Sequence, residues 1–457
     1  MSYICARCIT NPDLSILVAA EANEYNVCDY CERSQPAVDI DFVAQQCSDV
    51  IDIFFENSSQ TMAVVHFNMT PAGEDLNTLL ERLTGAPGDA IEALEETLHQ
   101  IWHDSDSDWS MYGDDPWFVP SLGYGGTELH SAWTDMEMSL RNDAHYINPK
   151  AVKLLDSIFG DITSNAASAG ARVVTDAGPS SQYETLYRAR VFQSEEDMQR
   201  ALQHPERNLG APPAGVAKSG RMNAPGQPAF YGATSVDTAL AEVRPSVGSW
   251  VVIARFAIIR PLQLLNLNLL SQLNFHPRAR YFDSESKQVF RRYAFLRELS
   301  RRMVRPVMPE SREHNYLITQ VVADYLAMHP TTSLDGIIYP SVQRGANNHN
   351  GSGENVVLFH KAATAIASDR EPGTAEAELY DYDDDDYDER PYANRPLQPT
   401  ILYIDADPLT QAFQRYSYNR PAPGLKLIRD SIEIHQILAV DIRTDRTKVQ
   451  VVCGRQR

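Results

Sequence analysis

The chain has 457 residues, of which 43% are hydrophobic, so it has room for two or three domains with buried cores. Its 61 acidic and 40 basic residues give a formal net charge of -21, which argues against nonspecific binding to nucleic acid or to an anionic membrane. We find no stretch of about 18 apolar residues and no basic N-terminal segment before a long apolar core. We therefore expect neither a membrane span nor a signal peptide, and we take a cytoplasmic location as the default.

Residues 1–36 contain four cysteines in two Cys-x2-Cys pairs. Cys5 and Cys8 form the first pair, Cys28 and Cys31 form the second, and 19 residues separate them. In a long chain expected to be intracellular, this spacing is typical of a metal site and not of a disulfide framework. Four thiolates fill a tetrahedral coordination sphere and leave no position for water, so we expect a structural zinc ion. A redox dithiol pair, or cysteines that only pack, is the alternative.

Residues 37–162 are predicted to form an all-α domain, because apolar residues recur at helical spacing of three and four positions. Between the second and third predicted helices, residues 103–124 form an acidic segment that is rich in aromatic rings. These rings either pack over the helices or form a docking surface. The predicted helices cover residues 74–84, 89–102, 128–141 and 149–159.

Residues 163–182 are rich in Ser, Ala and Gly and are predicted to be a linker. After them, strand-like segments and two longer helical segments indicate an α+β domain over residues 183–457. The predicted strands cover residues 185–192, 249–258, 335–340, 355–360, 400–404, 432–442 and 448–452, and the predicted helices cover residues 288–303 and 313–328.

Residues 361–394 interrupt this domain with a charged, low-complexity insertion that contains the run DYDDDDYDE at 381–389. A calcium loop needs ligands at fixed spacing and a Gly turn, and the run has neither. We therefore expect a solvated loop without regular structure.

One Arg, one aromatic ring and one carboxylate follow each other closely in the α+β domain. Arg221 lies in a loop punctuated by Gly and Pro, whose backbone can approach a ligand closely. Tyr231 ends a short strand-like run, and Glu242 lies in a helical segment that begins with Ser235 at its N-cap. If these elements converge, the guanidinium can grip phosphates and the ring can stack on a base. Together with the carboxylate, these are the groups needed to hold a dinucleotide such as NAD and to polarise its ribose.

Ser341 directly follows a buried strand and precedes a Gly- and Asn-rich loop. Mixed folds often place ligand-contacting groups at such a position, although Ser is also an ordinary turn residue. Five short motifs, taken together in their order and spacing, resemble the RES family, which is named for an Arg, a Glu and a Ser. The motifs are GRMN at 220–223, PAFY at 228–231, ALAEV at 239–243, DGIIYPS at 335–341 and NVVLF at 355–359.

The resemblance implies a fold related to ADP-ribosyltransferases and an activity that consumes NAD, usually as the toxin of a bacterial toxin-antitoxin pair. It assigns the family's Arg, ring, Glu and Ser to Arg221, Tyr231, Glu242 and Ser341. Simple members are short single domains, whereas this chain adds a four-cysteine module, a helical domain and an acidic insertion. The usual separate antitoxin is therefore in doubt, and an antitoxin, immunity or sensor protein and a homo-oligomer stay open as partners.

The roles follow from the bond to be broken. Cleavage of the nicotinamide–ribose bond builds positive charge on the sugar ring, so we expect Glu242 to stabilise an oxocarbenium-like transition state. Arg221 is expected to clamp the pyrophosphate, Tyr231 to stack on nicotinamide, and Ser341 to hydrogen-bond the ribose or the carboxamide. Arg188 is a second candidate phosphate clamp, with a surface ion pair as the alternative.

Two Asn residues of the same motifs, Asn223 and Asn355, are further candidates for binding NAD. The acceptor of the ADP-ribose group decides between hydrolysis by water, phosphorolysis by phosphate, and transfer to a protein side chain. The residues do not favour one of these acceptors.

Residues 37–160 resemble the HEPN-like N-terminal domain that is fused to some RES proteins, on the motif RNDAHY at 141–146. Many HEPN domains cut RNA with an Arg and a His, so a ribonuclease toxin using Arg141 and His145 is an alternative function. Only three residues separate this pair, one fewer than the motif normally has, and the negative net charge disfavours RNA. An interaction protein with a zinc module and an inert RES domain is a third interpretation.

Overall fold

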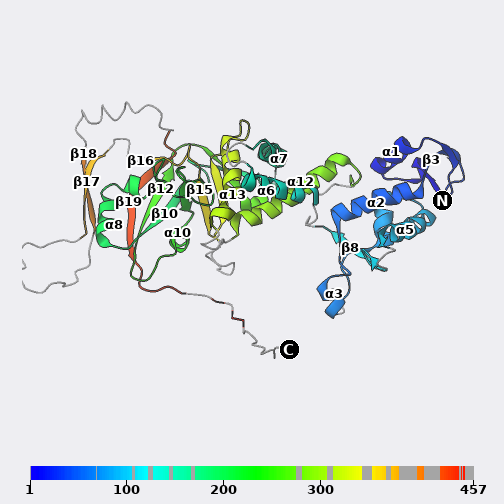
Figure 1. Ribbon diagram of the computed structural model, residues 1–457, viewed down its shortest axis with the longest axis horizontal. Helices are drawn as coiled ribbons and strands as arrows, with labels where there is room; N and C mark the ends of the chain where they lie inside the picture. The colour runs from blue at the N-terminus through cyan, green and yellow to red at the C-terminus, as the bar shows by residue number, and fades with distance from the viewer. Residues whose placement is uncertain are drawn as a thin grey trace, which may run out of the picture. The chain divides into compact units, whose positions relative to one another are not determined.

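The computed structural model consists of two compact units (Figure 1). The N-terminal unit combines Met1–Val173 with Leu269–Met303, and the C-terminal unit combines Val174–Asn268 with Val304–Arg457. The chain therefore leaves the N-terminal unit, returns to it and leaves it again. The residues described are 2–67, 69–104, 109–121, 127–143, 148–165, 170–273, 280–305, 312–341, 353–366, 372–379, 399–405, 422–441, 444 and 446–447.

The four-cysteine segment folds around a small sheet with the strand order β1-β3-β2. Asn11 begins the following helix, because its side chain accepts hydrogen bonds from the N–H groups of Asp13 and Leu14. The sheet and the turn after its first strand bring the four cysteines into one cluster. The elements are β1 (Tyr3–Cys5), η1 (Ala6–Cys8), α1 (Pro12–Glu21), β2 (Tyr25–Val27) and β3 (Ser34–Asp39).

Amphipathic helices build the main core of the N-terminal unit. In α2 and α5 the buried residues recur every three or four positions, so each helix has one apolar face turned to the core. Gly85 ends α4 in the left-handed conformation with φ +58°, which suits a residue without a side chain. The helices are α2 (Ile40–Phe54), α3 (Met62–Phe67), α4 (Leu76–Thr84), α5 (Gly88–Trp102), α6 (Thr127–Asn142), α7 (Pro149–Phe159), η2 (Ile162–Ser164) and α12 (Ser284–Val304).

Short strands accompany these helices, so the prediction of an all-α, HEPN-like domain is not confirmed. The strand with the sequence WFVP lies in the aromatic segment 103–124, where β-forming residues replace the helical spacing. Among the described rings of that segment, Tyr112 and Phe118 pack against Trp102 of α5. The strands are β4 (Phe55–Asn57), β5 (Glu74–Asp75) and β8 (Trp117–Pro120) in one sheet, and β6 (His103–Asp104) and β7 (Trp109–Ser110) in another.

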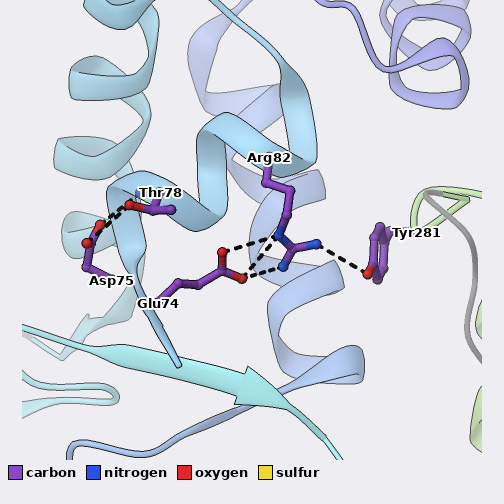
Figure 2. Close-up of polar contacts among 5 residues, drawn as sticks. All are labelled: Glu74, Asp75, Thr78, Arg82 and Tyr281. Atoms are coloured by element: carbon purple, nitrogen blue, oxygen red, sulfur yellow. Dashed lines mark hydrogen bonds and ion pairs between the residues drawn. The ribbon is translucent and has the colours of Figure 1, made fainter. Parts of the chain in front are cut away.

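A polar bridge connects α4 to the segment that returns to the N-terminal unit. Arg82 donates hydrogen bonds to both carboxylate oxygens of Glu74 and, over 3.3 Å, to the hydroxyl of Tyr281 (Figure 2). Tyr281 also packs edge-on against Phe54 of α2, and Phe290 of α12 belongs to the same buried cluster. The returning segment is therefore part of this core.

A mixed sheet forms the centre of the C-terminal unit. Over the described residues its strand order is β16-β19-β12-β10-β11-β15-β14-β13-β9, and only the pairs β13–β14 and β16–β19 are parallel. Helices pack on this sheet, so mixed helices and strands agree with the α+β prediction for this part of the chain (Figure 1). The strands are β9 (Val174–Ala177), β10 (Thr185–Phe192), β11 (Phe230–Ala233), β12 (Trp250–Ile258), β13 (Leu262–Asn266), β14 (Gly336–Pro340), β15 (Glu354–Leu358), β16 (Ala365–Ile366) and β19 (Leu425–Gln436), and the helices are α8 (Glu195–Leu202), α9 (Pro205–Asn208), α10 (Val236–Val243), α11 (Leu267–Leu270) and α13 (Arg312–Met328).

The predicted insertion 361–394 contains strands, which differs from the loop without regular structure that its composition indicated. Besides β16, it contains β17 (Pro372–Glu378), which pairs antiparallel with β18 (Thr400–Asp405). The acidic run 381–389 lies outside the described residues. None of the helices in the described ranges is long and apolar enough to cross a membrane.

Candidate functional site

Glu242 lies in the last turn of α10 and is held by side chains from elsewhere in the chain. The helix begins at Ser235, whose side-chain oxygen accepts a hydrogen bond from the N–H of Thr238 over 3.2 Å. The Oε1 atom of Glu242 accepts two hydrogen bonds, from Oγ of Ser341 over 2.8 Å and from Nδ2 of Asn355 over 2.7 Å. Among the residues that the structure describes, none donates to Oε2. The two donors therefore fix the carboxylate and leave one oxygen for another partner.

The β14–β15 pair brings the two donors to Glu242. These strands are antiparallel with Tyr339 opposite Asn355, and the N–H of Ser341 donates to the carbonyl of Gly353 over 2.9 Å. Gly353 lies against α10, since a Cβ added there would fall 1.9 Å from Oγ1 of Thr238. The close approach of this strand end to the helix therefore requires glycine.

A cavity of about 300 Å³ opens beside this carboxylate. Side chains from α10, β10, β11, β14 and β15 line it, so it lies where the central strands of the sheet meet the helix. Polar and aromatic groups predominate among them: Glu242, Asn355, Arg188, Tyr187, Tyr231 and Tyr339.

Arg188 of β10 supplies the positive charge of this cavity. Its guanidinium lies 4.9 Å from the ring centroid of Phe230, and its Nη1 donates to the backbone carbonyl of Tyr231 over 3.2 Å. Burial, with some repulsion from Arg190, lowers the pKa of Arg188 to about 10, so the cation persists at neutral pH. Within the described ranges no carboxylate pairs with it, so the alternative of an ion pair receives no support.

Tyr231 lines the cavity with its ring, while its hydroxyl is engaged elsewhere. The hydroxyl accepts a hydrogen bond from the N–H of Met222 over 3.0 Å and donates to Oδ1 of Asn223 over 2.7 Å. Burial raises the pKa of Tyr231 to about 12. Asn223 in turn donates to the carbonyls of Lys218 and Gln227, so its amide braces the Arg221 loop and does not reach the cavity.

Arg221 does not line the cavity. Its Nη1 donates to the carbonyl of Arg305 over 2.9 Å, and its guanidinium lies 5.8 Å from the ring centroid of Tyr316. Its charge nevertheless acts on the phenols of Tyr231 and Tyr339, favouring a lower pKa at each. Arg221 is therefore close enough to the cavity to act on its phenols, but its side chain is hydrogen-bonded to the backbone of Arg305.

Tyr339 is a cavity residue that the sequence interpretation did not single out. Burial raises the pKa of its hydroxyl, and the neighbouring Tyr231 and Glu242 add to this effect. The hydroxyl has no hydrogen-bond partner among the described residues. A signal was present, because residues two apart on a strand point to the same side, and Tyr339 lies two positions before Ser341.

Of the two residues proposed for RNA cleavage, Arg141 and His145, only Arg141 lies within the described residues. Arg141 is exposed in the last turn of α6, and His145 lies outside the described residues. The alternative of a ribonuclease site therefore stays a prediction.

The four cysteines are close enough to hold a metal ion. Their ligand atoms all lie within 4.8 Å of one another, and the closest sulfur pairs are 3.7–3.8 Å apart. A tetrahedron with metal–sulfur bonds of about 2.3 Å has sulfur–sulfur edges of about 3.8 Å. Gln35 donates from Nε2 to the sulfurs of Cys5 and Cys31, as an outer donor to metal-bound thiolates does.

The family model of the RES domain matches residues 185–385, a span that contains Arg188, Arg221, Tyr231, Glu242 and Ser341. No curated protein and no solved structure matches the chain, so the relation to ADP-ribosyltransferases stays a prediction. RES domains are NAD-related and toxin-like, which points to NAD-related enzymatic activity in general. The C-terminal part of the chain therefore contains a RES domain, at residues 185–385.

Proposed function

We propose that this protein is a toxin-type enzyme that degrades NAD by cleaving its nicotinamide–ribose bond. The observation that carries the proposal is the Glu242 carboxylate, which two donors orient at the wall of a cavity that also contains a guanidinium. Cleavage leaves positive charge on the ribose, and a fixed carboxylate stabilises such charge without reorganising during the reaction. The unengaged Oε2 of Glu242 is the oxygen we assign to this role.

The other groups of the cavity suit the rest of the substrate. Arg188 is a partly desolvated cation, and no carboxylate pairs with it among the described residues. A phosphate group of NAD would neutralise its positive charge, so we propose Arg188 as the main pyrophosphate clamp. We retain Arg221 as a second clamp because its charge reaches the same phenols. We assign stacking on nicotinamide to the ring of Tyr231, because its hydroxyl is already engaged.

The size of the cavity indicates which part of NAD it takes. At about 300 Å³ it is at the small end of ligand pockets, so we expect it to enclose the nicotinamide riboside half. We expect the adenosine half to lie outside it. Ser341 and Asn355 then act by positioning Glu242, and not as the direct ribose and cofactor contacts expected from the sequence.

The experiment that tests the proposal compares NAD turnover by the purified wild-type chain and by Glu242→Gln. The amide keeps the size of the side chain and removes the charge, so we expect the rate to fall by roughly two decades. Glu184→Gln is the matched control, because Glu184 is exposed in the same unit and does not line the cavity. Equal rates for Glu242→Gln and wild type would contradict the proposal.

The identity of the product settles the acceptor. ADP-ribose indicates water, ADP-ribose phosphate indicates inorganic phosphate, and a labelled protein band indicates transfer to a side chain. We further propose a cytoplasmic location and regulation by an antitoxin, immunity or sensor protein, in keeping with the toxin-like family.

We also propose zinc as the metal of the four-cysteine site. Four cysteine thiolates are a common ligand set of structural zinc, and the sulfur spacing fits its tetrahedral coordination. Cys5, Cys8, Cys28 and Cys31 would hold the ion and leave no open position, so its contribution is to stability and not to NAD chemistry.

A further inference from the structure

A second and larger cavity lies elsewhere in the C-terminal unit. It encloses about 570 Å³ between α8, the starts of β12 and β18, the end of β17 and the middle of β19. None of the residues that line it lines the cavity beside Glu242. It is therefore a separate feature with no role in the chemistry proposed above.

Apolar and acidic side chains together line this cavity. Met198 and Leu202 of α8 are 2% and 1% exposed, and Trp250 adds an aromatic surface at the start of β12. The charged lining residues comprise three carboxylates and one guanidinium: Glu195, Glu378, Asp430 and Arg429. The lining therefore combines apolar side chains with an excess of negative charge.

Specific contacts hold the walls of the cavity in place. Nε2 of Gln199 donates to the carbonyl of Ala377 over 2.7 Å, which ties α8 to β17. Ala377 lies opposite Ile401 in the β17–β18 pair, and Ala377 belongs to the same buried cluster as Leu202. A ligand would therefore meet a cavity that is already formed, which lowers the entropic cost of binding.

We propose that this cavity docks a basic amphipathic segment of a partner protein. Apolar side chains of the segment fill the space over Met198 and Trp250, and its Lys or Arg side chains pair with the carboxylates of Glu195, Glu378 and Asp430. The net charge of -21 favours the approach of a basic partner over that of an acidic one. This inference does not depend on the proposed NAD chemistry, because the two cavities share no lining residue.

The test uses the full chain and labelled synthetic peptides followed by fluorescence anisotropy. The first probe is an amphipathic Leu/Lys peptide, and the second has Ser in place of every Leu and the same charge. We expect saturable binding of the first probe and binding weaker by at least about tenfold for the second, because it has no apolar side chains to fill the cavity. We also expect the emission of Trp250 to change on binding, and this change to disappear in Trp250→Phe.

Charge variants distinguish docking in the cavity from nonspecific attraction of the basic peptide to the negative net charge of the protein. The triple variant Glu195→Gln, Glu378→Gln and Asp430→Asn should weaken binding of the Leu/Lys peptide by on the order of tenfold, from about twofold for each lost ion pair. The control variant, Glu81→Gln with Glu92→Gln and Glu96→Gln, loses the same charge from exposed positions of the N-terminal unit and should bind within about twofold of wild type. Thermal melts verify that both variants are folded.

Three results would overturn the inference. If both triple variants weaken the peptide equally, binding follows net charge alone. If the Ser-containing peptide binds as tightly as the Leu/Lys peptide, the cavity is not occupied. If the full chain shows no saturable binding of the Leu/Lys peptide, the cavity does not accept this class of partner.

Discussion

Three tyrosines line the cavity beside Glu242, and the hydroxyls of two of them, Tyr231 and Tyr339, differ in what they bind. The hydroxyl of Tyr231 makes two hydrogen bonds to the Arg221 loop, whereas that of Tyr339 has no partner among the described residues. Both hydroxyls have a raised pKa, so both are protonated at neutral pH. Of these two hydroxyls, that of Tyr339 is therefore the one available to donate to a substrate.

We predict opposite results for the two Tyr→Phe variants. Tyr231→Phe leaves the N–H of Met222 and Oδ1 of Asn223 without their partner, so the free energy of unfolding should fall by about 1–3 kcal/mol. Tyr339→Phe should leave stability nearly unchanged and lower the rate of NAD turnover. Urea unfolding and NAD assays on both variants test this. A stable Tyr231→Phe together with a fully active Tyr339→Phe would contradict the assignment.

Several residues around the cavity could be predicted from the sequence. Their contacts could not be predicted, because contacts depend on the geometry of the fold. The motifs contain Glu242, Ser341 and Asn355, which the structure brings into direct contact. Sequence spacing does not tell which atoms a side chain has already engaged, so Tyr231 and Asn223 were expected to meet NAD although their polar groups bind the Arg221 loop. These site assignments stay predictions until activity is measured.

At the scale of elements, the approach of α10 to the β14–β15 strands rests on a glycine. Gly353→Ala would place a methyl group 1.9 Å from Oγ1 of Thr238, so the helix and the strand must separate. We predict a loss of about 1–3 kcal/mol in unfolding free energy. NAD turnover should fall as well, because Glu242 and Asn355 lie on the two elements that move apart.

Gly88 offers the matched control for this substitution. No atom lies within 4 Å of a Cβ added at Gly88, which is the first residue of α5. Gly88→Ala should therefore leave stability and turnover unchanged or raise stability slightly, since Ala favours helix more than Gly does. Equal effects of the two substitutions in chemical denaturation would show that the contact with Thr238 is unimportant.

The strand β17 illustrates how composition can hide an alternating pattern. In the sequence, Thr374, Glu376 and Glu378 alternate with Ala375, Ala377 and Leu379, the residue that follows the strand, and both Ala377 and Leu379 are buried. This is the period of two that a half-buried strand requires. The neighbouring acidic run dominates the composition of residues 361–394, so composition alone does not reveal this alternation.

For the whole molecule, we predict that the purified protein contains about one zinc ion per chain. Cys8→Ser removes one of four ligands, so the metal content should fall and the N-terminal unit should lose stability, because metal binding and folding are linked. Elemental analysis and thermal unfolding measure the two effects. Cys47→Ser is the control for the loss of a thiol, since Cys47 is buried outside the cluster. A wild-type protein without metal would contradict this prediction.

Stability should also fall in alkaline solution. Burial raises the pKa of Tyr112 in the N-terminal unit and of Tyr231 in the C-terminal unit to about 12, against about 10 for a free phenol. Below pH of about 10, both the folded and unfolded chains keep these protons, so the two groups do not change the stability. Between about 10 and 12 only the unfolded chain releases them, so the free energy of unfolding decreases.

Urea unfolding at about pH 9 and about pH 11 tests this dependence. Tyr231→Phe should show a smaller decrease between the two pH values than the wild type, because it has one phenol fewer to titrate. The same decrease in both proteins would remove Tyr231 as a cause.

The division into units could not be derived from periodicity. Apolar spacing correctly indicated helix near residues 288–303, and α12 covers Ser284–Val304, but spacing does not identify the core that a helix joins. That core is the N-terminal one, because Phe290 packs against Phe54 at 4.7 Å between ring centroids. The proposed boundaries at 36, 162 and 182 therefore stay predictions.

The bridge from Arg82 to Tyr281 has a consequence for the gene as well as for the protein (Figure 2). Since Leu269–Met303 completes the first core from within the second half of the chain, no single uninterrupted stretch of codons encodes either unit alone. Recombination between relatives that exchanged residues 1–173 would pair the N-terminal core with a foreign α12. The two halves of the gene should therefore be inherited together. A library of chimeras that join two relatives at a single crossover point should yield few folded proteins.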